Sequence, residues 1–196
     1  MLTEAVEVIR KLWRGGRQNH RGRHYTVENA RIFSLPEQLP PIFIASACKR
    51  SAQLAGRVAE GIICTKPNPS TIEAFDHAGG KGKRRFGQLT VCWARHEAQA
   101  RRQALEIWPN AAIKGQASFE LPLPRHFDEL AQGMTEDDVA SNVICGPDPK
   151  KHLDAIREFG EAGFDHVFRS SGWPGAERLR RLLSERNFAG ASCHDV

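Results

Sequence analysis

The segment formed by residues 43–65 constrains the fold more than any other part of this chain. Its first five residues are apolar or small, three apolar residues then recur at helical spacing, and Gly61 precedes a second short apolar run. This order predicts a strand, a turn, a helix and a second strand, which together make a βαβ unit. Parallel strands need a helical crossover of this kind. The three residues at helical spacing are Ala52, Ala55 and Val58.

The remainder of the chain continues this alternation of helices and short apolar strands. Such an alternation predicts an α/β fold with about four parallel strands, covered by helices on both faces. Strand order cannot be derived from the sequence, so an open doubly wound sheet and a barrel both remain compatible with it. Further strands are expected at 88–94, 143–145 and 166–169, with a small hairpin at 19–27. Helices are expected at 2–13, 70–77, 97–108, 125–132, 136–142, 149–162 and 176–186.

The composition of the 196 residues is that of a soluble globular protein. Hydrophobic residues make up 40% and charged residues 26% of the chain, which argues against wholesale disorder. No apolar run approaches the roughly 18 residues of a membrane span, and no signal peptide pattern opens the sequence. We therefore expect a cytoplasmic protein with no membrane partner.

The basic residues raise the question of nucleic-acid binding, because the net charge is +5 and the pI is near 9.1. They gather at 10–23, 81–85 and 178–181, and no nucleic-acid-binding motif accompanies them. We interpret them as solvated faces and expect no nucleic-acid partner. A second interpretation is that part of this charge steers an anionic cofactor or substrate toward the protein.

Neither the cysteines nor the histidines indicate a metal site. The five cysteines are odd in number and scattered, and three of them lie in apolar, strand-like runs, so we expect buried, reduced thiols rather than disulfides. His20 and His24 have no carboxylate or third ligand at a metal-binding spacing. They are therefore expected in a solvated hairpin.

Several blocks of the sequence recur together, in one order, in a known family. They are LTEAVEVIRKLWRGG (2–16), HRGRHYTVENARIFSLP (20–36), FIASACKRSAQLAGRVAEGIICT (43–65), LTVCWA (89–94), EIWPNAA (106–112), CGPDP (145–149) and EAGFDHVF (161–168). In these blocks the chain resembles the luciferase-like monooxygenase superfamily. The resemblance is to the branch near the glucose-6-phosphate dehydrogenase that uses the deazaflavin coenzyme F420.

This resemblance implies a (β/α)8 TIM barrel, which needs roughly 250 residues. The present chain has 196 and opens inside a helical pattern, so we expect the carboxyl-terminal part of such a barrel, with the last four to five βα units. This partial domain is expected to span residues 1–190, followed by a disordered tail at 191–196. Residues 109–124 lack periodicity and are expected to form an insertion loop above the barrel mouth.

The resemblance also implies a chemistry. Family members of this branch transfer a hydride between coenzyme F420 and a small organic substrate, and the alternative is an FMN-dependent monooxygenase of the same superfamily. The family's catalytic His, Glu and Asp come from early strands and match no position here, so no catalytic residue is assigned. A non-catalytic half-barrel is the rival hypothesis. Its open strand edges and apolar interior would favour association, as a homodimer or with a partner chain.

The resemblance also implies part of a cofactor-binding site in this chain. Consecutive backbone N–H groups at the start of the crossover helix are expected to hold the cofactor phosphate, beside the end of the next strand. The alternative is an ordinary strand-to-helix turn with two exposed basic residues. Glycines are usual in the family at this turn, and their replacement restricts the backbone angles and the closeness of approach. The basic residues 49 and 50 could compensate by direct charge pairing. The implied cofactor-binding residues are Ser46, Ala47, Cys48, Lys49, Cys64 and Thr65.

The substrate is expected to differ from glucose 6-phosphate. The positions that grip the sugar phosphate in the dehydrogenase correspond here to Asn68, Ser118 and Asn142, and none of them is cationic. Each lost charge-assisted hydrogen bond typically costs about 1.5–3 kcal/mol.

Overall fold

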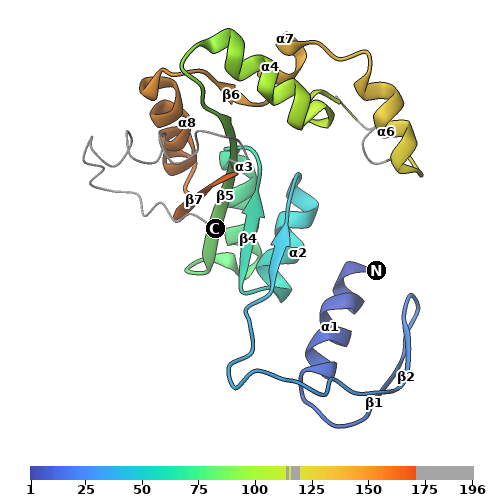
Figure 1. Ribbon diagram of the computed structural model, residues 1–196. Helices are drawn as coiled ribbons and strands as arrows, with labels where there is room; N and C mark the ends of the chain where they lie inside the picture. The colour runs from blue at the N-terminus through green and yellow to red at the C-terminus, as the bar shows by residue number, and fades with distance from the viewer. Residues whose placement is uncertain (114, 116–119, 171–196) are drawn as a thin grey trace. The chain divides into compact units, whose positions relative to one another are not determined.

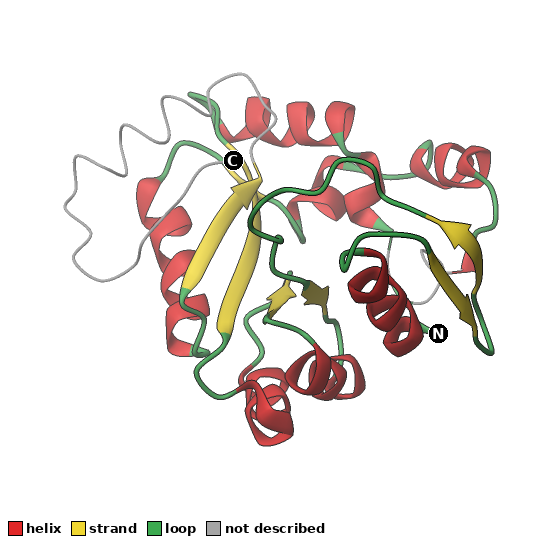
Figure 2. Ribbon diagram, turned by 90° about the horizontal axis from the view of Figure 1, so that it is seen from below, coloured by secondary structure: helices red, strands yellow, loops and turns green. Residues whose placement is uncertain are grey.

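The computed structural model describes residues 1–113, 115 and 120–170. The chain divides into two compact units, Met1–Phe86 and Gly87–Val196. Helices separate the strands that follow the first hairpin, and two of the strand pairs, 43–45 with 61–64 and 84–92 with 144–145, are parallel (Figures 1 and 2). The chain therefore has an α/β fold with parallel strand pairing, as the sequence predicts. The expected closing helix at 176–186 and the expected tail at 191–196 lie outside the described residues.

The first unit opens with a helix and an antiparallel hairpin, both at the predicted places. Gly15 and Gly16 follow the helix with φ values of 74° and 66°, a conformation that favours glycine and ends the helix. The hairpin turns at Gly22, whose N–H donates to the carbonyl oxygen of Tyr25 at 2.9 Å. These elements are α1 (Leu2–Leu12), β1 (Gln18–Arg21) and β2 (Thr26–Ala30) (Figure 1).

A partly buried carboxylate connects this hairpin to the helix. Glu4 of α1 accepts hydrogen bonds from the backbone N–H groups of Tyr25 (2.9 Å) and His24 (3.1 Å) and lies 3.2 Å from Nε2 of His20. Its side chain is only 14% exposed. The expectation of a solvated hairpin is therefore wrong for His20, which is partly buried against a carboxylate 16 residues earlier in the chain.

The predicted βαβ unit is confirmed. β3 (Phe43–Ala45) and β4 (Gly61–Cys64) are parallel, with Phe43 opposite Gly61, and α2 (Lys49–Val58) connects them. The apolar face of α2 is fully buried at Ala52 and Ala55. Small residues on this face let the helix lie close to the strands.

The helix α2 also packs closely on the next helical segment. A Cβ atom added at Gly56 would lie 2.4 Å from the carbonyl oxygen of Phe75, so a larger residue would separate the two segments. Phe75 itself is fully buried. The segment consists of α3 (Pro69–Phe75), as predicted, and a π-helical turn (Asp76–Gly80), of which the expected helix at 70–77 includes only the first two residues.

The strand β5 (Arg84–Cys92) begins earlier than the expected strand at 88–94. Its first residues lie in the first unit, where the ring of Phe86 packs on that of Phe43 with centroids 4.8 Å apart. This aromatic contact joins residues 43 positions apart, and local periodicity does not reveal it. The sequence analysis interpreted the basic residues at 81–85 as a solvated face, whereas the last two of them begin this strand.

The second unit contains two further strands paired with β5. β6 (Ile144–Cys145) is parallel to β5, with Val91 opposite Ile144, and β7 (His166–Ser170) also pairs with β5. All the expected helices between 97 and 162 are present. They are α4 (Glu97–Ile107), α6 (Pro124–Ala131), α7 (Glu136–Ala140) and α8 (Pro149–Glu161), with a 3-10 helix at Pro109–Ala112.

Helix caps in this unit follow the sequence pattern. The hydroxyl of Thr135 accepts a hydrogen bond from the backbone N–H of Asp138 (3.2 Å), whose carboxylate accepts one from the Thr135 N–H (3.2 Å), so the two residues form a capping box at the start of α7. Asp148 caps α8 by accepting from the N–H of Lys150 at 2.9 Å. The core face of α8 buries Leu153, Ile156 and Phe159.

The four described cysteines have free thiols and differ in burial, and Cys193 lies outside the described residues. Cys64, Cys92 and Cys145 are buried, as the sequence predicts, whereas Cys48 is exposed and corrects that expectation. Among the described residues, no helix is long and apolar enough to cross a membrane. Within the same ranges, no cluster of three or more His, Cys, Asp and Glu side chains is placed to hold a metal ion.

Candidate functional site

The two parallel strands of the βαβ unit end side by side. The backbone N–H of Ser46 donates to the carbonyl oxygen of Ile63 at 2.8 Å, which extends the pairing of β3 and β4 by one residue. The chain then turns through Ala47 and Cys48 into α2. The carboxyl ends of both strands and the amino-terminal end of α2 therefore lie at one edge of the unit, as expected for the cofactor-binding residues.

The turn needs no glycine. Cys48 is extended, with φ −150° and ψ 165°, and Asn29 is the one non-glycine residue with a positive φ among the described residues. Ala47 and Cys48 therefore adopt angles open to any residue. The expected restriction of the backbone angles is not found, and only the volume of the two side chains distinguishes this turn from a glycine turn.

A serine that the sequence analysis did not single out fastens the helix start. The hydroxyl of Ser51 donates to the carbonyl oxygen of Cys48 at 2.9 Å and lies 3.4 Å from the Cys48 N–H. Ser51 is the third residue of α2, where capping boxes place a side chain that reaches back to the N-cap. That position is the signal that could have identified it.

The helix start combines exposed N–H groups with an exposed thiol. The first backbone N–H groups of α2 have no acceptor within the helix, and Ala47, Cys48 and Lys49 are exposed. Hydrogen bonding to the Ser51 side chain, and then to the N–H groups of Ser51 and Arg50, lowers the pKa of the Cys48 thiol. The Cys48 sulfur therefore already occupies part of the space in which an anion would meet these N–H groups.

The remaining expected residues divide into buried and exposed ones. Ser46 is 7% and Cys64 3% exposed, and burial raises the pKa of the Cys64 thiol to about 11. The buried hydroxyl of Ser46 has no hydrogen-bond partner within the described part of the chain. Thr65, directly after β4, is exposed. Its exposed position places it beside the start of α2, where a ligand could reach it.

The side chains of Asn68 and Asn142, two of the positions that correspond to the sugar-phosphate site, form hydrogen bonds within the protein. The side-chain oxygen of Asn68 accepts hydrogen bonds from the N–H (3.0 Å) and the hydroxyl (2.9 Å) of Ser70 and so caps α3. Asn142 donates to the hydroxyl of Ser141 at 3.2 Å. Ser118 lies outside the described residues.

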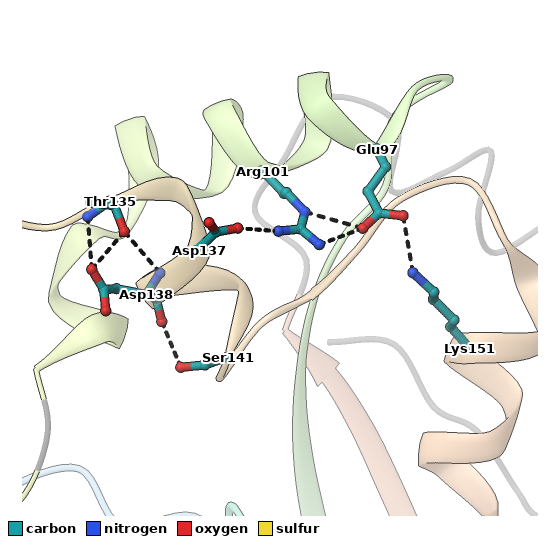
Figure 3. Close-up of polar contacts among 7 residues, drawn as sticks. All are labelled: Glu97, Arg101, Thr135, Asp137, Asp138, Ser141 and Lys151. Atoms are coloured by element: carbon teal, nitrogen blue, oxygen red, sulfur yellow. Dashed lines mark hydrogen bonds and ion pairs between the residues drawn. The ribbon is translucent and has the colours of Figure 1, made fainter.

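A second polar cluster lies in the second unit and consists of ion pairs between side chains (Figure 3). Arg101 donates to Glu97 at 2.6 Å and also pairs with Asp137, while Lys151 donates to the other oxygen of Glu97 at 3.0 Å. These ion pairs line a cavity of about 430 Å³ and join α4, α7 and α8. Because its four charges neutralise one another, we assign the cluster to stability and retain the turn at 46–49 as the candidate site.

Comparison with known proteins places the chain among relatives. Residues 1–166 match the sequence profile described as luciferase-like monooxygenase. The chain is 28% identical to the F420-dependent glucose-6-phosphate dehydrogenase of Microbacterium testaceum (strain StLB037), over 94% of this chain and 58% of that protein. It is 27% identical to the enzyme of the same name from Rhodococcus hoagii (strain 103S), over 96% of this chain and 59% of that protein.

A solved structure is also similar. It is an F420-dependent secondary alcohol dehydrogenase in complex with an F420-acetone adduct, with a TM-score of 0.76 and 21% identity, over 94% of this chain and 59% of that chain. At this identity the likeness concerns the fold alone. The chain spans less than two thirds of the length of each of these relatives.

Proposed function

Because the chain belongs to the luciferase-like monooxygenase family, we propose that it is part of an oxidoreductase in which the turn at 46–49 holds the phosphate of coenzyme F420. The two relatives at 27–28% identity carry the name of F420-dependent enzymes, which supports this cofactor over FMN. When bound, the deazaflavin supplies hydride transfer to or from a small organic substrate. The two units are then parts of one (β/α)8 barrel domain, with the turn at its mouth.

The observation that carries the proposal is the exposed start of α2 at the end of two parallel strands. The N–H groups of a helix start bind anions, and the carboxyl ends of parallel strands are where α/β proteins place their ligands. Lys49 and Arg50 are exposed beside these N–H groups and add positive charge. Thr65 contributes a hydroxyl from the neighbouring strand end.

The proposed substrate is not a sugar phosphate, although the relatives are named for glucose 6-phosphate. Asn68 lacks a charge and its side-chain oxygen is engaged in the cap of α3. Asn142 is uncharged as well. Neither position supplies a cation of its own to a phosphate dianion, so we propose an uncharged small organic substrate.

Titration of the purified chain with coenzyme F420 and, separately, with FMN tests the proposal. Each cofactor is followed by its own absorbance and fluorescence. We expect saturable binding of the deazaflavin that is tighter than that of FMN. Tighter binding of FMN would favour a flavin-dependent monooxygenase. Binding of neither would favour a non-catalytic half-barrel that associates with another chain.

A further inference from the structure

A cavity of about 450 Å³ lies at the carboxyl-terminal end of α2, within the first unit. Residues from α1, from the α2–β4 connection and from the start of β5 line it. The ten residues of α2 rise by about 15 Å, so this cavity lies at the other end of the helix from the turn at 46–49. Its charged lining residues are Arg10, Arg57, Glu60, Lys83 and Arg84.

The single carboxylate of the cavity is already neutralised. The guanidinium of Arg10 pairs with one oxygen of Glu60, and the backbone N–H of Ile42 donates to the other at 2.8 Å. Glu60 therefore has little capacity left to repel an anion or to pair with another cation. Among the residues that the structure describes, no carboxylate pairs with the other three basic side chains of the cavity, Arg57, Lys83 and Arg84.

Lys83, Arg57 and Arg84 carry N–H groups that can donate hydrogen bonds to an anion. Nζ of Lys83 donates to the carbonyl oxygen of Gly56 at 2.6 Å, which uses one of its three protons and offsets the negative end of α2. Arg57 and Arg84 are exposed, and within the part of the chain that the structure describes neither forms an ion pair. Guanidinium groups bind phosphate oxygens through two parallel hydrogen bonds.

We propose that this cavity binds a compact polyanion that carries two or more phosphate groups, with pyrophosphate as the simplest example. A cavity of about 450 Å³ falls in the size range of ligand pockets and exceeds what one small ion needs. Among the described residues, its apolar lining is limited to Val58 and Ala59 and includes no aromatic side chain that could stack on a nucleobase. Charge, rather than a base or a sugar, therefore determines what binds here.

Isothermal titration calorimetry with inorganic pyrophosphate, at low and at physiological salt, tests this site on the full chain. We expect saturable binding that Arg57→Gln and Arg84→Gln each weaken about tenfold or more, as loss of a charge-assisted hydrogen bond predicts. Arg57→Lys should restore part of the affinity because it retains the charge. Arg23→Gln is the matched control, because Arg23 is exposed in the hairpin and changes the net charge equally.

Comparison of the Arg57 and Arg23 variants distinguishes binding in the cavity from nonspecific attraction of pyrophosphate by the net charge. Equal weakening by Arg23→Gln and Arg57→Gln would overturn the proposal, as would the absence of binding by the folded wild-type chain at millimolar pyrophosphate. A single-stranded oligonucleotide that binds more tightly than pyrophosphate, and needs Arg57, would instead identify a nucleic-acid surface. Thermal unfolding monitored by circular dichroism verifies that each variant is folded. Cofactor titration of the same variants should be unchanged, because the two sites are separate.

Discussion

The N–H of Ser46 and the carbonyl oxygen of Ile63 form the last hydrogen bond between the two strands of the βαβ unit, at 2.8 Å. This bond fixes where β3 ends relative to β4. Because of it, the turn into α2 lies level with the end of β4, and Thr65 is the next exposed residue along that strand's direction. The proposed cofactor site depends on this alignment.

Loss of the Thr65 hydroxyl should weaken binding of the deazaflavin. A hydroxyl that donates to a phosphate oxygen is worth about 1–2 kcal/mol, so Thr65→Ala should raise Kd by roughly fivefold to thirtyfold. Thr65→Ser should retain most of the affinity. The control His24→Ala, in the hairpin, should leave Kd unchanged in the same fluorescence titration. Equal effects of Thr65→Ala and His24→Ala would show that the proposed cofactor site is misplaced.

Replacement of Cys48 by glycine should strengthen cofactor binding. The variant Cys48→Gly removes the sulfur that shares the N–H groups of Arg50 and Ser51, and so frees them for the phosphate. We expect Kd to fall by about twofold to tenfold. The pKa of the Cys48 thiol is lowered, so its thiolate should repel the phosphate as the pH rises, and wild-type Kd should increase with pH. Cys48→Gly should lack that increase.

Cys48 should react first among the four described thiols. It is exposed and has a lowered pKa, whereas burial raises the pKa of Cys64, Cys92 and Cys145 to about 11, 12 and 11. Only the thiolate is nucleophilic. Limited treatment with iodoacetamide near neutral pH, followed by peptide mass spectrometry, should label Cys48 well before the other three. Cys48→Ser removes this site, and faster labelling of Cys64 would contradict the burial of β4.

The hairpin should separate from α1 at low pH. Burial raises the pKa of Glu4, but hydrogen bonds from Tyr25, His20 and His24 outweigh it and lower the pKa from 4.5 to about 2. The stabilisation by this carboxylate is therefore present above pH 4.5 and is lost as the pH falls toward 2. Amide hydrogen exchange at Tyr25 should accelerate over that range.

At neutral pH the variant Glu4→Ala should cause the same acceleration. The control Glu7→Ala, at an exposed position of α1, should not change the exchange of the hairpin amides. Unchanged exchange in Glu4→Ala would contradict the role of Glu4 as the anchor.

The second unit should lose stability below neutral pH because of His152. This side chain is fully buried, lies with Nε2 3.0 Å from the carbonyl oxygen of Gly146, and has an Nδ1 without a partner in the described structure. Burial lowers its pKa, an effect that the nearby charge of Arg169 supports and that of Asp148 opposes. As the pH falls, His152 therefore takes up a proton at a higher pH in the unfolded chain than in the folded chain.

The stability from neutral His152 is present above its ordinary pKa of 6.5 and is lost as the pH falls below it. The free energy of unfolding should decline by up to about 1.4 kcal/mol per pH unit. Urea unfolding at pH 7.5, 6.5 and 5.5 measures this slope. His152→Gln should reduce it, and the exposed His96→Gln should not. The same slope in all three proteins would assign the pH dependence to other groups.

Local sequence patterns predicted the elements that form the candidate site. Apolar periodicity located α2 and the two strands beside it, and the helix expected at 149–162 corresponds to α8. These features involve residues a few positions apart, which is the range over which helix and strand preferences act. The boundaries differ by a few residues, as at the start of β5.

Those local patterns do not predict contacts between residues that are far apart in the sequence. Glu4 meets His20 and Tyr25 only because the hairpin folds back on α1, and Phe86 meets Phe43 only across paired strands. The exposure of Cys48 follows from its place in a turn rather than a strand. The cavity near Arg57 likewise assembles charges from three separate segments, which the sequence shows only as scattered basic residues.

Amide chemical shifts measured by two-dimensional NMR during titration with coenzyme F420 test the central claim most directly. We predict saturable shifts of the N–H resonances of Ala47, Cys48, Lys49 and Thr65, with little change at Arg57. Saturable binding that shifts none of these four resonances, or shifts only residues outside the βαβ unit, would contradict the claim that this turn holds the cofactor phosphate.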